Sequence, residues 1–220
     1  MLRIGVHGAT GRMGRLVLEE IAANPDISVV WAAGRDLPRD PAADVVIDFS
    51  TPEGFARLYD QAKCPIVSGT TGMPVPEAPR VPLLHAANFS LGVAVLRRLV
   101  VQARAALPDY DVELVEMHHR HKRDAPSGTA LRLIEGLGPV RNGHDGLRIP
   151  GEIGVHAVRG GDIVGEHTVY LCGPGERVQL GHVATHRGVF AAGAVRAARW
   201  IVGKPAGRYS IEDVIGVLPE

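Results

Sequence analysis

The stretch Leu2–Gly14, which reads LRIGVHGATGRMG, decides the fold. It opens with a short apolar run typical of a β-strand, and glycines follow at positions 8, 11 and 14. A helical pattern from Leu16 to Ala22 comes next, and then a second strand-like run, Ile27–Ala33. In dinucleotide-binding turns, such glycines allow a tight bend, close approach of the backbone to a pyrophosphate, and tight helix–strand packing. A glycine motif alone is weak evidence, but this context predicts a cofactor-binding layer rather than a merely structural turn.

The first half of the chain continues to alternate strand and helix. Further short apolar strands are expected at Asp44–Asp48, Pro65–Ser68 and Pro82–Ala86, with helical patterns after the first, third and fifth strands. This alternation is typical of a parallel, doubly wound sheet covered on both faces. An amphipathic helix expected over Asn88–Leu107 then leads out of this layer.

The pattern changes in the second half. Three strand-like runs separated by glycine-containing turns predict an antiparallel meander, with the runs at Glu152–Arg159, Ile163–Leu171 and Arg177–Ala184. We expect a loop over Gly136–Pro150 and a helix over Arg187–Val202. The predicted fold class is therefore α/β: a Rossmann-like doubly wound parallel sheet plus a second α+β domain with an open mixed or antiparallel sheet.

The second sheet also predicts self-association. One face is expected to pack on a helix that starts near Ser127, and the other is predicted to be apolar, carrying Val155, Ala157, Val169 and Leu171. An open sheet with an apolar outer face is usually an interface. We therefore expect a homotetramer built through residues 152–184.

Composition narrows the class of protein. The chain has 220 residues, enough for one large or two small domains, and 45% of them are hydrophobic. Lys and Arg together number 24, as do Asp and Glu, and this balance argues against a dedicated nucleic-acid or membrane-surface protein. The only cysteines, Cys64 and Cys172, lie far apart, which favours reduced thiols in a cytoplasmic protein. We expect neither a signal peptide nor a transmembrane segment.

A second motif, EMHHRHKRDAPSGTA at Glu116–Ala130, concentrates proton donors and cations. Positions 118–123 hold three imidazoles and three fixed positive charges, at the end of a strand expected over Val112–Met117. Beyond Pro126, the backbone amides of residues 127–129 are expected to face outward from a helix N-terminus and to favour an anion. The combination predicts a site that binds a carboxylate and protonates it or a neighbouring atom.

Two plainer interpretations of this motif stay open. A charged strand end can be a solvated edge, and clustered histidines can bind zinc, with Asp124 as a further ligand. The three cations among the histidines would repel a divalent metal that lacks a compensating acidic cluster. We therefore favour an anionic substrate and expect no metal.

Other strand ends fall at the carboxyl edge of the predicted sheet, where ligands bind in open α/β folds. After the strand expected over Asp44–Asp48, Ser50 or Thr51 can simply cap the helix that begins near Pro52. The segments Gly69–Gly72 and Ala86–Ser90 are small and hydrogen-bonding, which lets a flat ring lie against the backbone.

With these residues in view, the chain resembles the 4-hydroxy-tetrahydrodipicolinate reductases, also called dihydrodipicolinate reductases, of diaminopimelate and lysine biosynthesis. The resemblance covers nearly the whole length and is most specific in the histidine–lysine–SGT motif. It rests on Gly8–Gly14, Phe49–Pro52, Gly69–Gly72, Ala87–Ser90, Glu116–Ala130, Arg159–His167 and Phe190–Ala194. It implies a dinucleotide-binding domain at residues 1–89 and 187–220, and a substrate-binding and oligomerisation domain at residues 90–186.

The resemblance also implies roles for individual residues. His118 is implied as the acid/base that protonates the reduced substrate, and Lys122 as the second proton donor; such an imidazole and a cationic lysine suit a substrate with carboxylates. The substrate ligands would be His119, Ser127, Gly128 and Thr129. NADPH or NADH would be held by Gly8, Ala9, Thr10, Gly11, Arg12, Met13, Gly69, Thr70, Thr71, Ala86, Ala87, Asn88 and Phe89.

Two departures from the family pattern bear on the cofactor. Members often carry an acidic residue and then a basic one after the second strand, but this chain has Gly34 and Arg35. Arg35 is therefore a further predicted cofactor ligand and favours NADPH, although Asp36 could still reach a ribose hydroxyl. The chain is also shorter than typical members, with trimmed segments after Asp36 and around residues 136–142.

Two rival functions are weighed against this one. A different reductase of aldehydes or imines would keep the glycine turn but would not need the anion site at residues 118–129. A non-catalytic nucleotide sensor would need no proton donors, which this chain retains.

Overall fold

The computed structural model describes residues 1–38, 42–143 and 146–216, and it divides the chain into two compact units. One unit comprises Met1–Leu91 with Arg187–Glu220, and the other comprises Gly92–His186. The predicted boundary after residue 89 lies two residues from the first of these divisions. The functions assigned to the two predicted domains stay predictions.

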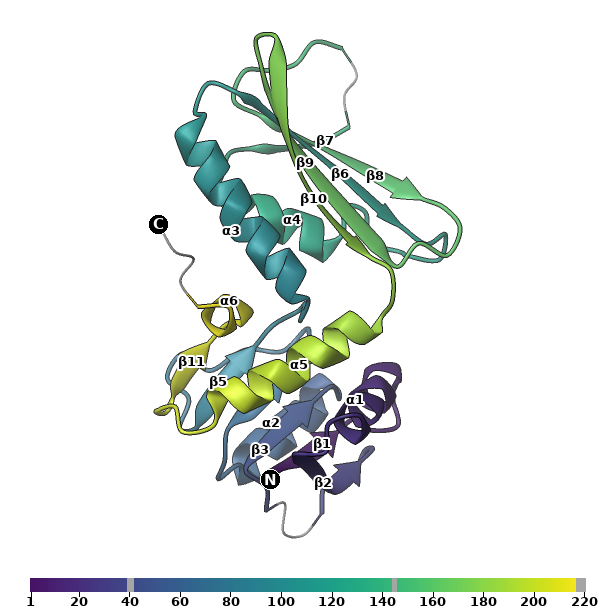
Figure 1. The fold of residues 1–220 in the computed structure, drawn as a ribbon, viewed down its shortest axis with the longest axis vertical. Helices are drawn as coiled ribbons and strands as arrows, with labels where there is room; N and C mark the ends of the chain where they lie inside the picture. The colour runs from purple at the N-terminus through teal and green to yellow at the C-terminus, as the bar shows by residue number, and fades with distance from the viewer. Residues whose placement is uncertain (39–41, 144–145, 217–220) are drawn as a thin grey trace. The chain divides into compact units, whose positions relative to one another are not determined.

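The first unit is a six-stranded, all-parallel sheet flanked by helices (Figure 1). Its strand order is β11-β5-β4-β3-β1-β2, so the direction of winding reverses between β1 and β3. Its elements are β1 (Leu2–His7), α1 (Arg12–Ala22), β2 (Ile27–Ala33), β3 (Val45–Asp48), α2 (Pro52–Gln61), β4 (Ile66–Ser68), β5 (Pro82–His85), α5 (Gly188–Ile201), β11 (Gly207–Tyr209) and α6 (Ile211–Val214). The predicted doubly wound layer is confirmed, while β11 and α6 are elements that the sequence patterns did not indicate.

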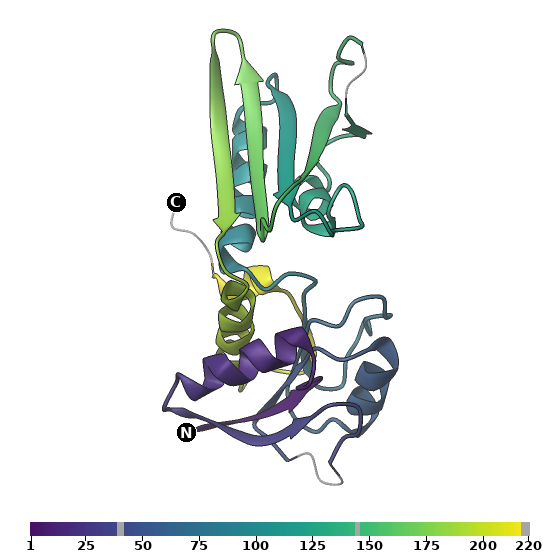
Figure 2. The same ribbon diagram turned by 90° about the vertical axis from the view of Figure 1, so that its right-hand side faces the viewer.

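The two faces of this sheet are covered by different helices. Figure 2 shows α1 and α5 on one face and α2 on the other, as right-handed crossovers on either side of a reversal require. Strand β3 is buried throughout, which explains its continuous apolar character. Helix α2 begins where the Thr51 hydroxyl accepts a hydrogen bond from the Gly54 amide, with Pro52 in the first turn. Thr51 is therefore the cap, and Ser50 is not.

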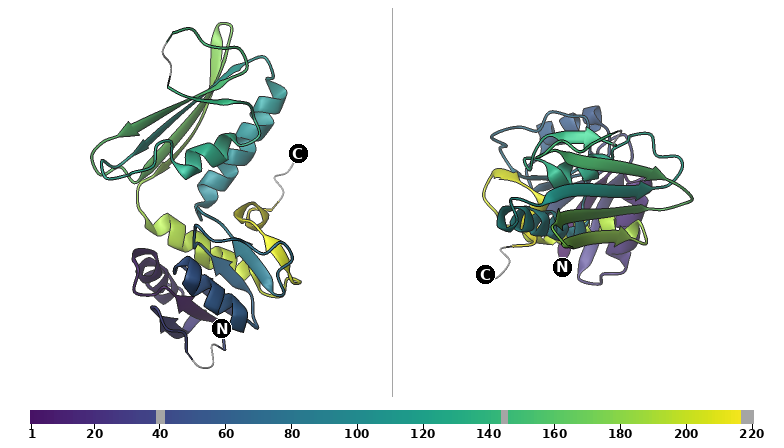
Figure 3. Two further views of the ribbon diagram at one scale, coloured as in Figure 1. Left: turned by 180° about the vertical axis from the view of Figure 1, so that it is seen from behind. Right: turned by 90° about the horizontal axis from the view of Figure 1, so that it is seen from above.

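The second unit is a five-stranded mixed sheet with two helices on one of its faces (Figure 3). Its elements are α3 (Leu91–Ala106), β6 (Asp111–His118), α4 (Gly128–Ile134), β7 (Val140–Asn142), β8 (Ile153–Arg159), β9 (Gly165–Gly173) and β10 (Glu176–Ala184). Helix α3 begins three residues after the predicted Asn88, because the Asn88 side chain accepts a hydrogen bond from the Ser90 amide in the preceding loop. The core lies between the helices and the sheet and includes Leu96, Leu114, Leu133 and Ile153.

The predicted antiparallel meander is confirmed for β9 and β10, which pair as antiparallel neighbours, but it is wrong for β8, which does not pair with β9. The strand order is β10-β9-β6-β8-β7, so β6 lies between β8 and β9, parallel to the first and antiparallel to the second. The glycines after β8 do not close a tight hairpin. They cross the end of β6 instead, where the Gly160 amide donates to the His118 carbonyl (2.9 Å) and the Arg120 amide donates to the Gly161 carbonyl (3.2 Å).

Two related predictions about this unit also need correction. Val155, Val169 and Leu171 belong to the buried core rather than to the outer face of the sheet; of the four named residues only Ala157 is exposed. On β9 the side chains alternate as expected, but the core face was assigned the wrong way round; on β8, Val155 is buried and Ala157, two residues further on, is exposed. The predicted loop 136–150 contains the short strand β7, which pairs with β8; positions 144–145 of that loop lie outside the described residues.

Both cysteines are half-buried free thiols. Among the described residues, no helix has the length and apolar character needed to cross a membrane.

Candidate active site

The candidate site lies at the carboxyl end of strand β6. The side chains of this strand alternate, and Val112, Leu114, Glu116 and His118 occupy the buried face. The first two join the apolar core, whereas the last two place a carboxylate and an imidazole on the same face. The side chain of Glu116 is fully buried, and that of His118 is 10% exposed. The motif at the strand end is therefore not a solvated edge at these two positions.

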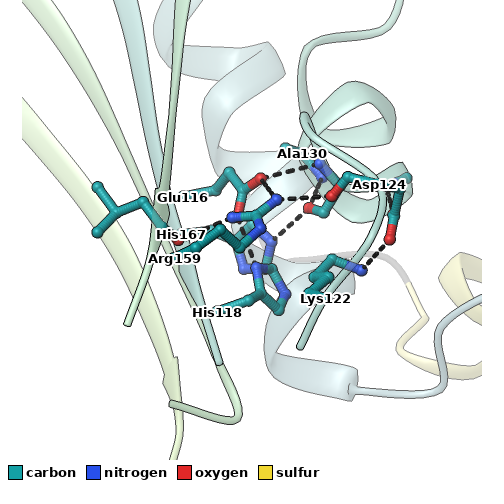
Figure 4. A network of polar contacts seen from close by, with 10 residues as sticks. Glu116, His118, Lys122, Asp124, Ala130, Arg159 and His167 are labelled. Carbon is teal, nitrogen blue, oxygen red and sulfur yellow. Dashed lines mark hydrogen bonds and ion pairs between the residues drawn. The ribbon is translucent and has the colours of Figure 1, made fainter. Parts of the chain in front are cut away.

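The Glu116 carboxylate is the centre of a hydrogen-bond network (Figure 4). Arg159 donates to it twice, from Nη1 to Oε2 at 2.8 Å and from Nη2 to Oε1 at 2.7 Å. The Ser127 amide donates to Oε1 (2.9 Å), and His118 Nδ1 lies 2.5 Å from Oε2. Burial raises the pKa of Glu116, but the hydrogen bonds from Arg159, His118 and Ser127 outweigh it and hold that pKa below its usual range.

Opposing influences act on the pKa of His118. Burial lowers its pKa, the Glu116 carboxylate raises it, and Lys122 and Arg159 lower it further; the net direction is downward. A histidine with a lowered pKa is a stronger acid when it is protonated. Its ring stands edge-on to that of His167, with 5.2 Å between the ring centroids.

Lys122 reaches the same region from the loop after β6. Its Nζ lies 2.9 Å from Asp124 Oδ1, and the hydrogen bond from Lys122 lowers the pKa of Asp124. Figure 4 shows these two side chains pointing toward each other beside the histidines. The neighbouring Arg123 is exposed. His119 is half-buried, and its ring centroid lies 6.3 Å from that of His121.

The predicted outward-facing amides at the start of α4 require a correction. The Ser127 amide does not face outward, because Glu116 accepts its hydrogen bond. The Gly128 amide makes a long contact (3.4 Å) with Asp124 Oδ2. Ser127 is buried, and its hydroxyl accepts from the Ala130 amide (3.1 Å) as the helix cap. Gly128 is exposed and Thr129 half-buried, so their predicted role as substrate ligands stays open to test.

Sequence reasoning missed Arg159 and His167 as members of this cluster. Arg159 comes opposite His118 only through the parallel register of β8 on β6. His167 enters from β9, and its Nε2 lies 3.3 Å from the Ser127 hydroxyl. Burial lowers the pKa of His167 to about 4, so this ring is neutral at physiological pH. Neither residue has a local pattern that marks it; only their inclusion in the family resemblance singled out residues 159–167.

The glycine turn of the first unit has the geometry that a dinucleotide needs. Gly8 has a φ of +76°, and a Cβ built there would lie 2.3 Å from the Phe49 carbonyl oxygen. A Cβ on Gly14 would lie 2.2 Å from the Gly8 carbonyl oxygen, so α1 packs directly on the turn. Gly11 stands at the N-cap of α1 without a side-chain cap, which leaves the first amides of an eleven-residue helix open to a phosphate.

A cavity of about 550 Å³ opens beside this turn. Its walls come from the glycine turn, the residues after β2, and the start of α2: His7, Gly8, Thr10, Gly11, Gly34, Arg35, Phe49, Ser50, Thr51, Glu53, Gly54 and Arg57. Arg35 is one of these wall residues, and its role as a cofactor ligand stays a prediction. Arg57, whose Nη2 donates to the Arg35 carbonyl (3.2 Å), and Glu53 are charged residues of this wall that sequence reasoning did not name.

Buried Asp48 ties the neighbouring strand ends together. It accepts hydrogen bonds from the hydroxyls of Ser50 (2.6 Å), Ser68 (2.7 Å) and Thr70 (2.7 Å), and its Oδ1 lies 2.8 Å from His7 Nδ1. Burial raises the pKa of Asp48, but these four partners outweigh it and keep that pKa low. Both hydrogen-bond donors of Thr70 are used within the protein, because its hydroxyl donates to Asp48 and its amide donates to the Ser68 hydroxyl oxygen (3.2 Å).

The remaining predicted cofactor residues lie on the same unit in different settings. Ala9 is buried behind the turn, while Thr10 and Arg12 are exposed and Met13 is half-buried. Thr71 and Ala87 are exposed, Ala86 is buried, and Asn88 is half-buried. Gly69 is required by packing, since a Cβ there would lie 2.2 Å from the Phe49 ring, and Phe89 meets that ring edge-on with 5.5 Å between centroids.

Comparison with known families matches nearly the whole chain. A family model described as "Dihydrodipicolinate reductase, N-terminus" matches residues 2–40 and 35–89. A second, described as "Dihydrodipicolinate reductase, C-terminus", matches residues 92–215.

Individual proteins give the same result. The chain is 43% identical to a 4-hydroxy-tetrahydrodipicolinate reductase of Aliarcobacter butzleri, over 99% of this chain and 100% of that one. It is also 43% identical to a protein of the same name from Halorhodospira halophila, over 98% and 99% of the two chains. The first alignment runs over 257 positions, so this 220-residue chain lacks residues that its relative has. Among solved structures, a dipicolinate-bound dihydrodipicolinate reductase from Paenisporosarcina has a TM-score of 0.79 at 23% identity, over 97% of this chain and 99% of that one.

Proposed function

Because this chain belongs to the dihydrodipicolinate reductase family, we propose that it reduces 4-hydroxy-tetrahydrodipicolinate to tetrahydrodipicolinate with a nicotinamide cofactor, a step of diaminopimelate and lysine biosynthesis. The observation that carries the proposal is the pair of proton donors at the end of β6, with His118 on the buried Glu116 carboxylate and Lys122 on Asp124, within a chain matched by the family over nearly its full length. A non-catalytic nucleotide sensor, the rival function, would not need these proton donors.

The 4-hydroxyl group of the substrate leaves as water, which gives a conjugated imine. The nicotinamide, when bound, would supply a hydride to that imine. The protein must then deliver a proton to the resulting enamine-like anion. His118 is the proposed donor, because it lies at the strand end and its lowered pKa makes its protonated form a ready acid. Lys122 neutralises a substrate carboxylate and serves as the second proton donor, which requires it to exchange Asp124 for the substrate.

The substrate is a small dicarboxylate, in keeping with the dipicolinate bound to the related reductase from Paenisporosarcina. We propose that His119, Gly128 and Thr129 bind its carboxylates. Ser127 contributes by capping α4 beside them, since its hydroxyl and amide already serve the Ala130 amide and Glu116.

For the cofactor, we propose that Gly8–Met13 hold the pyrophosphate and that Gly69–Thr71 and Ala86–Phe89 line the nicotinamide side. Arg35 and Arg57 bring two guanidinium groups to one cavity wall, where they favour the 2′-phosphate of NADPH. We expect both cofactors to work, with NADPH bound more tightly by about 1–2 kcal/mol, the size of a charge-assisted hydrogen bond.

The activity is tested by following nicotinamide absorbance after the chain is mixed with freshly made product of the synthase that precedes this step. Loss of absorbance that needs both the enzyme and that product is expected. Loss with simple aldehydes or imines instead would favour the rival reductase, and binding of the cofactor without turnover would favour the sensor.

Cofactor preference is tested by calorimetric titration of NADPH and NADH. Arg35→Ala should remove most of the difference between them and leave NADH binding nearly unchanged, and Arg57→Ala should act in the same direction. A wild-type chain that prefers NADH would show that Asp36 or Glu53, not the arginines, governs the pocket.

A further inference from the structure

The buried Glu116 is the feature of the second unit that the proposed chemistry leaves unexplained. It occupies a core-facing position of β6, in line with Val112 and Leu114, and none of its side chain is exposed. An ionised carboxylate in such a place is costly unless its charge and lone pairs are matched. The presence of the Glu116 carboxylate at this core-facing position therefore calls for a functional explanation.

Its partners keep it ionised and acceptor-only. Arg159 pairs with both oxygens, and the Ser127 amide donates to one of them, so three of the hydrogen bonds come from groups that are always donors. The remaining contact is His118 Nδ1, 2.5 Å from Oε2. Because the carboxylate cannot donate, Nδ1 must carry a hydrogen and point it at Glu116.

This arrangement decides which nitrogen of His118 does chemistry. With Nδ1–H committed to Glu116, Nε2 is the nitrogen that gains and loses the proton. Among the residues that the structure describes, Nε2 of His118 has no hydrogen-bond partner. Gly165 keeps the space beside it clear, since a Cβ there would lie only 3.1 Å from Nε2.

We propose that Glu116 is a positioning residue for proton transfer: with Arg159 as its counter-ion, it locks the ring and tautomer of His118 so that Nε2 presents the proton to the substrate. The inference rests on the proposed function, in which His118 is the proton donor. Glu116 itself does not touch the substrate.

The charges that face His118 set the expected pH dependence. They are Glu116 on its own strand, Arg159 on β8, Lys122 in the following loop with its partner Asp124, and the neutral His167 on β9. Of these, Glu116 is the one that raises the pKa of His118. A donor must be protonated, so activity should fall as pH rises through the pKa of His118. Removing the charge of Glu116 should move that fall to lower pH.

A purely architectural role is the alternative. Glu116 also ties Arg159 and Ser127, and through them β8 and α4, to β6. Loss of that anchor would lower activity by loosening the fold, but it would leave the tautomer and pKa of His118 as they are whenever the protein is folded.

The test uses Glu116→Gln in the full chain, with Glu113→Gln as its matched control. Glu113 lies on the same strand but on the other face, where its carboxylate contacts His156 Nε2 at 2.8 Å. Both variants therefore remove a carboxylate from β6 next to a histidine, but only one of them concerns His118.

The primary measurement is an NMR titration of ¹⁵N-labelled histidines in the cofactor-free protein. In the wild type, His118 should be a pure Nδ1–H tautomer. In Glu116→Gln, it should show the other tautomer, or a mixture, and a lower pKa, while Glu113→Gln should leave His118 unchanged. A wild-type tautomer and pKa in folded Glu116→Gln would overturn the proposal.

Kinetics supply the second measurement. Glu116→Gln should lower kcat by about 10²–10⁴-fold, with KM changed much less and the alkaline fall of the pH profile shifted to lower pH. Glu116→Asp, which keeps the charge, should recover part of the loss. If His118→Gln retained full turnover, the proposed function of His118 would fail, but the NMR result would still decide what Glu116 does to the ring.

Discussion

His118 ends a strand whose inward positions are otherwise apolar or paired, and this setting gives the residue its chemistry. Desolvation and the nearby cations lower its pKa, and the Glu116 carboxylate opposes them. An imidazole in this balance is a stronger acid than one in water, yet it is still oriented by a fixed hydrogen bond. Proton delivery should therefore be tested by replacing single residues.

Replacing His118 should damage turnover far more than binding. We expect His118→Gln to lower kcat by about 10²–10⁴-fold, the usual effect of removing a positioned acid, because the proton must then come from water. Substrate affinity, measured in the presence of an unreactive cofactor analogue, should change little. A chemical rate in single turnover equal to that of the wild type would remove His118 from the mechanism.

Lys122 should differ from its exposed neighbour Arg123. Lys122 is held at the site by Asp124 at 2.9 Å, and we propose that it meets a substrate carboxylate there. Lys122→Met should therefore lower kcat and raise KM, while Arg123→Met, its matched control, should do little. Steady-state kinetics at several ionic strengths check this; equal effects of the two substitutions would mean that the cations act only as a diffuse field.

Close backbone contacts position the elements of the first unit. Helix α5 approaches the loop after β5 so closely that a Cβ on Gly193 would lie 1.8 Å from the Phe89 carbonyl oxygen. The glycine at this position is therefore a requirement of packing. Because Phe89 belongs to the segment proposed to line the nicotinamide side, we expect the contact to couple the helix to cofactor binding.

Gly193→Ala should destabilise the protein despite the better helix propensity of alanine. The propensity gain is about 1 kcal/mol, whereas forcing atoms into a filled contact costs about 1–3 kcal/mol and here meets rigid backbone. Urea unfolding should show a lower midpoint, and titration should show weaker cofactor binding. Ala192→Ser, at the exposed neighbouring position, should leave both unchanged. An unaltered midpoint for Gly193→Ala would mean that α5 can shift without penalty.

The second unit leaves one face of its sheet without a helix from the same unit (Figure 3). Three of the four residues first assigned to that face are in the core instead, but exposed apolar side chains do occur in the sheet, with Val158 39% and Val183 58% exposed. Strand β10 is also a nine-residue edge strand. Open edges and apolar patches are commonly covered by another copy of the chain.

We therefore retain the prediction of a homotetramer assembled through the second unit. Light scattering at micromolar concentration should give four chain masses, and Val183→Lys should shift the protein to smaller species. Val101→Lys, a comparable change at an exposed position of α3, serves as the control. A monomer mass for the wild type would refute the prediction.

Local patterns in the sequence were sufficient for much of this protein. The glycines of Leu2–Gly14, followed by a helical period, predicted the doubly wound layer, because turn geometry and side-chain periodicity depend on neighbours in the chain. The same holds for β6, whose end places His118 and Lys122 where the motif indicated. These features need no knowledge of distant residues.

What the tertiary structure decided is which distant segments lie together. The insertion of β6 between β8 and β9 brings Arg159 to Glu116 across 43 residues of sequence, and Arg57 meets the carbonyl of Arg35 across 22. The predicted pairing of β8 with β9 failed for the same reason, since glycine turns between strands also suit a chain that crosses a third strand. Strand order and register are set by the burial of whole faces, and a shift of one residue exchanges those faces. The counter-ion of the buried carboxylate and the charges around the cofactor cavity could therefore be found only in the folded chain.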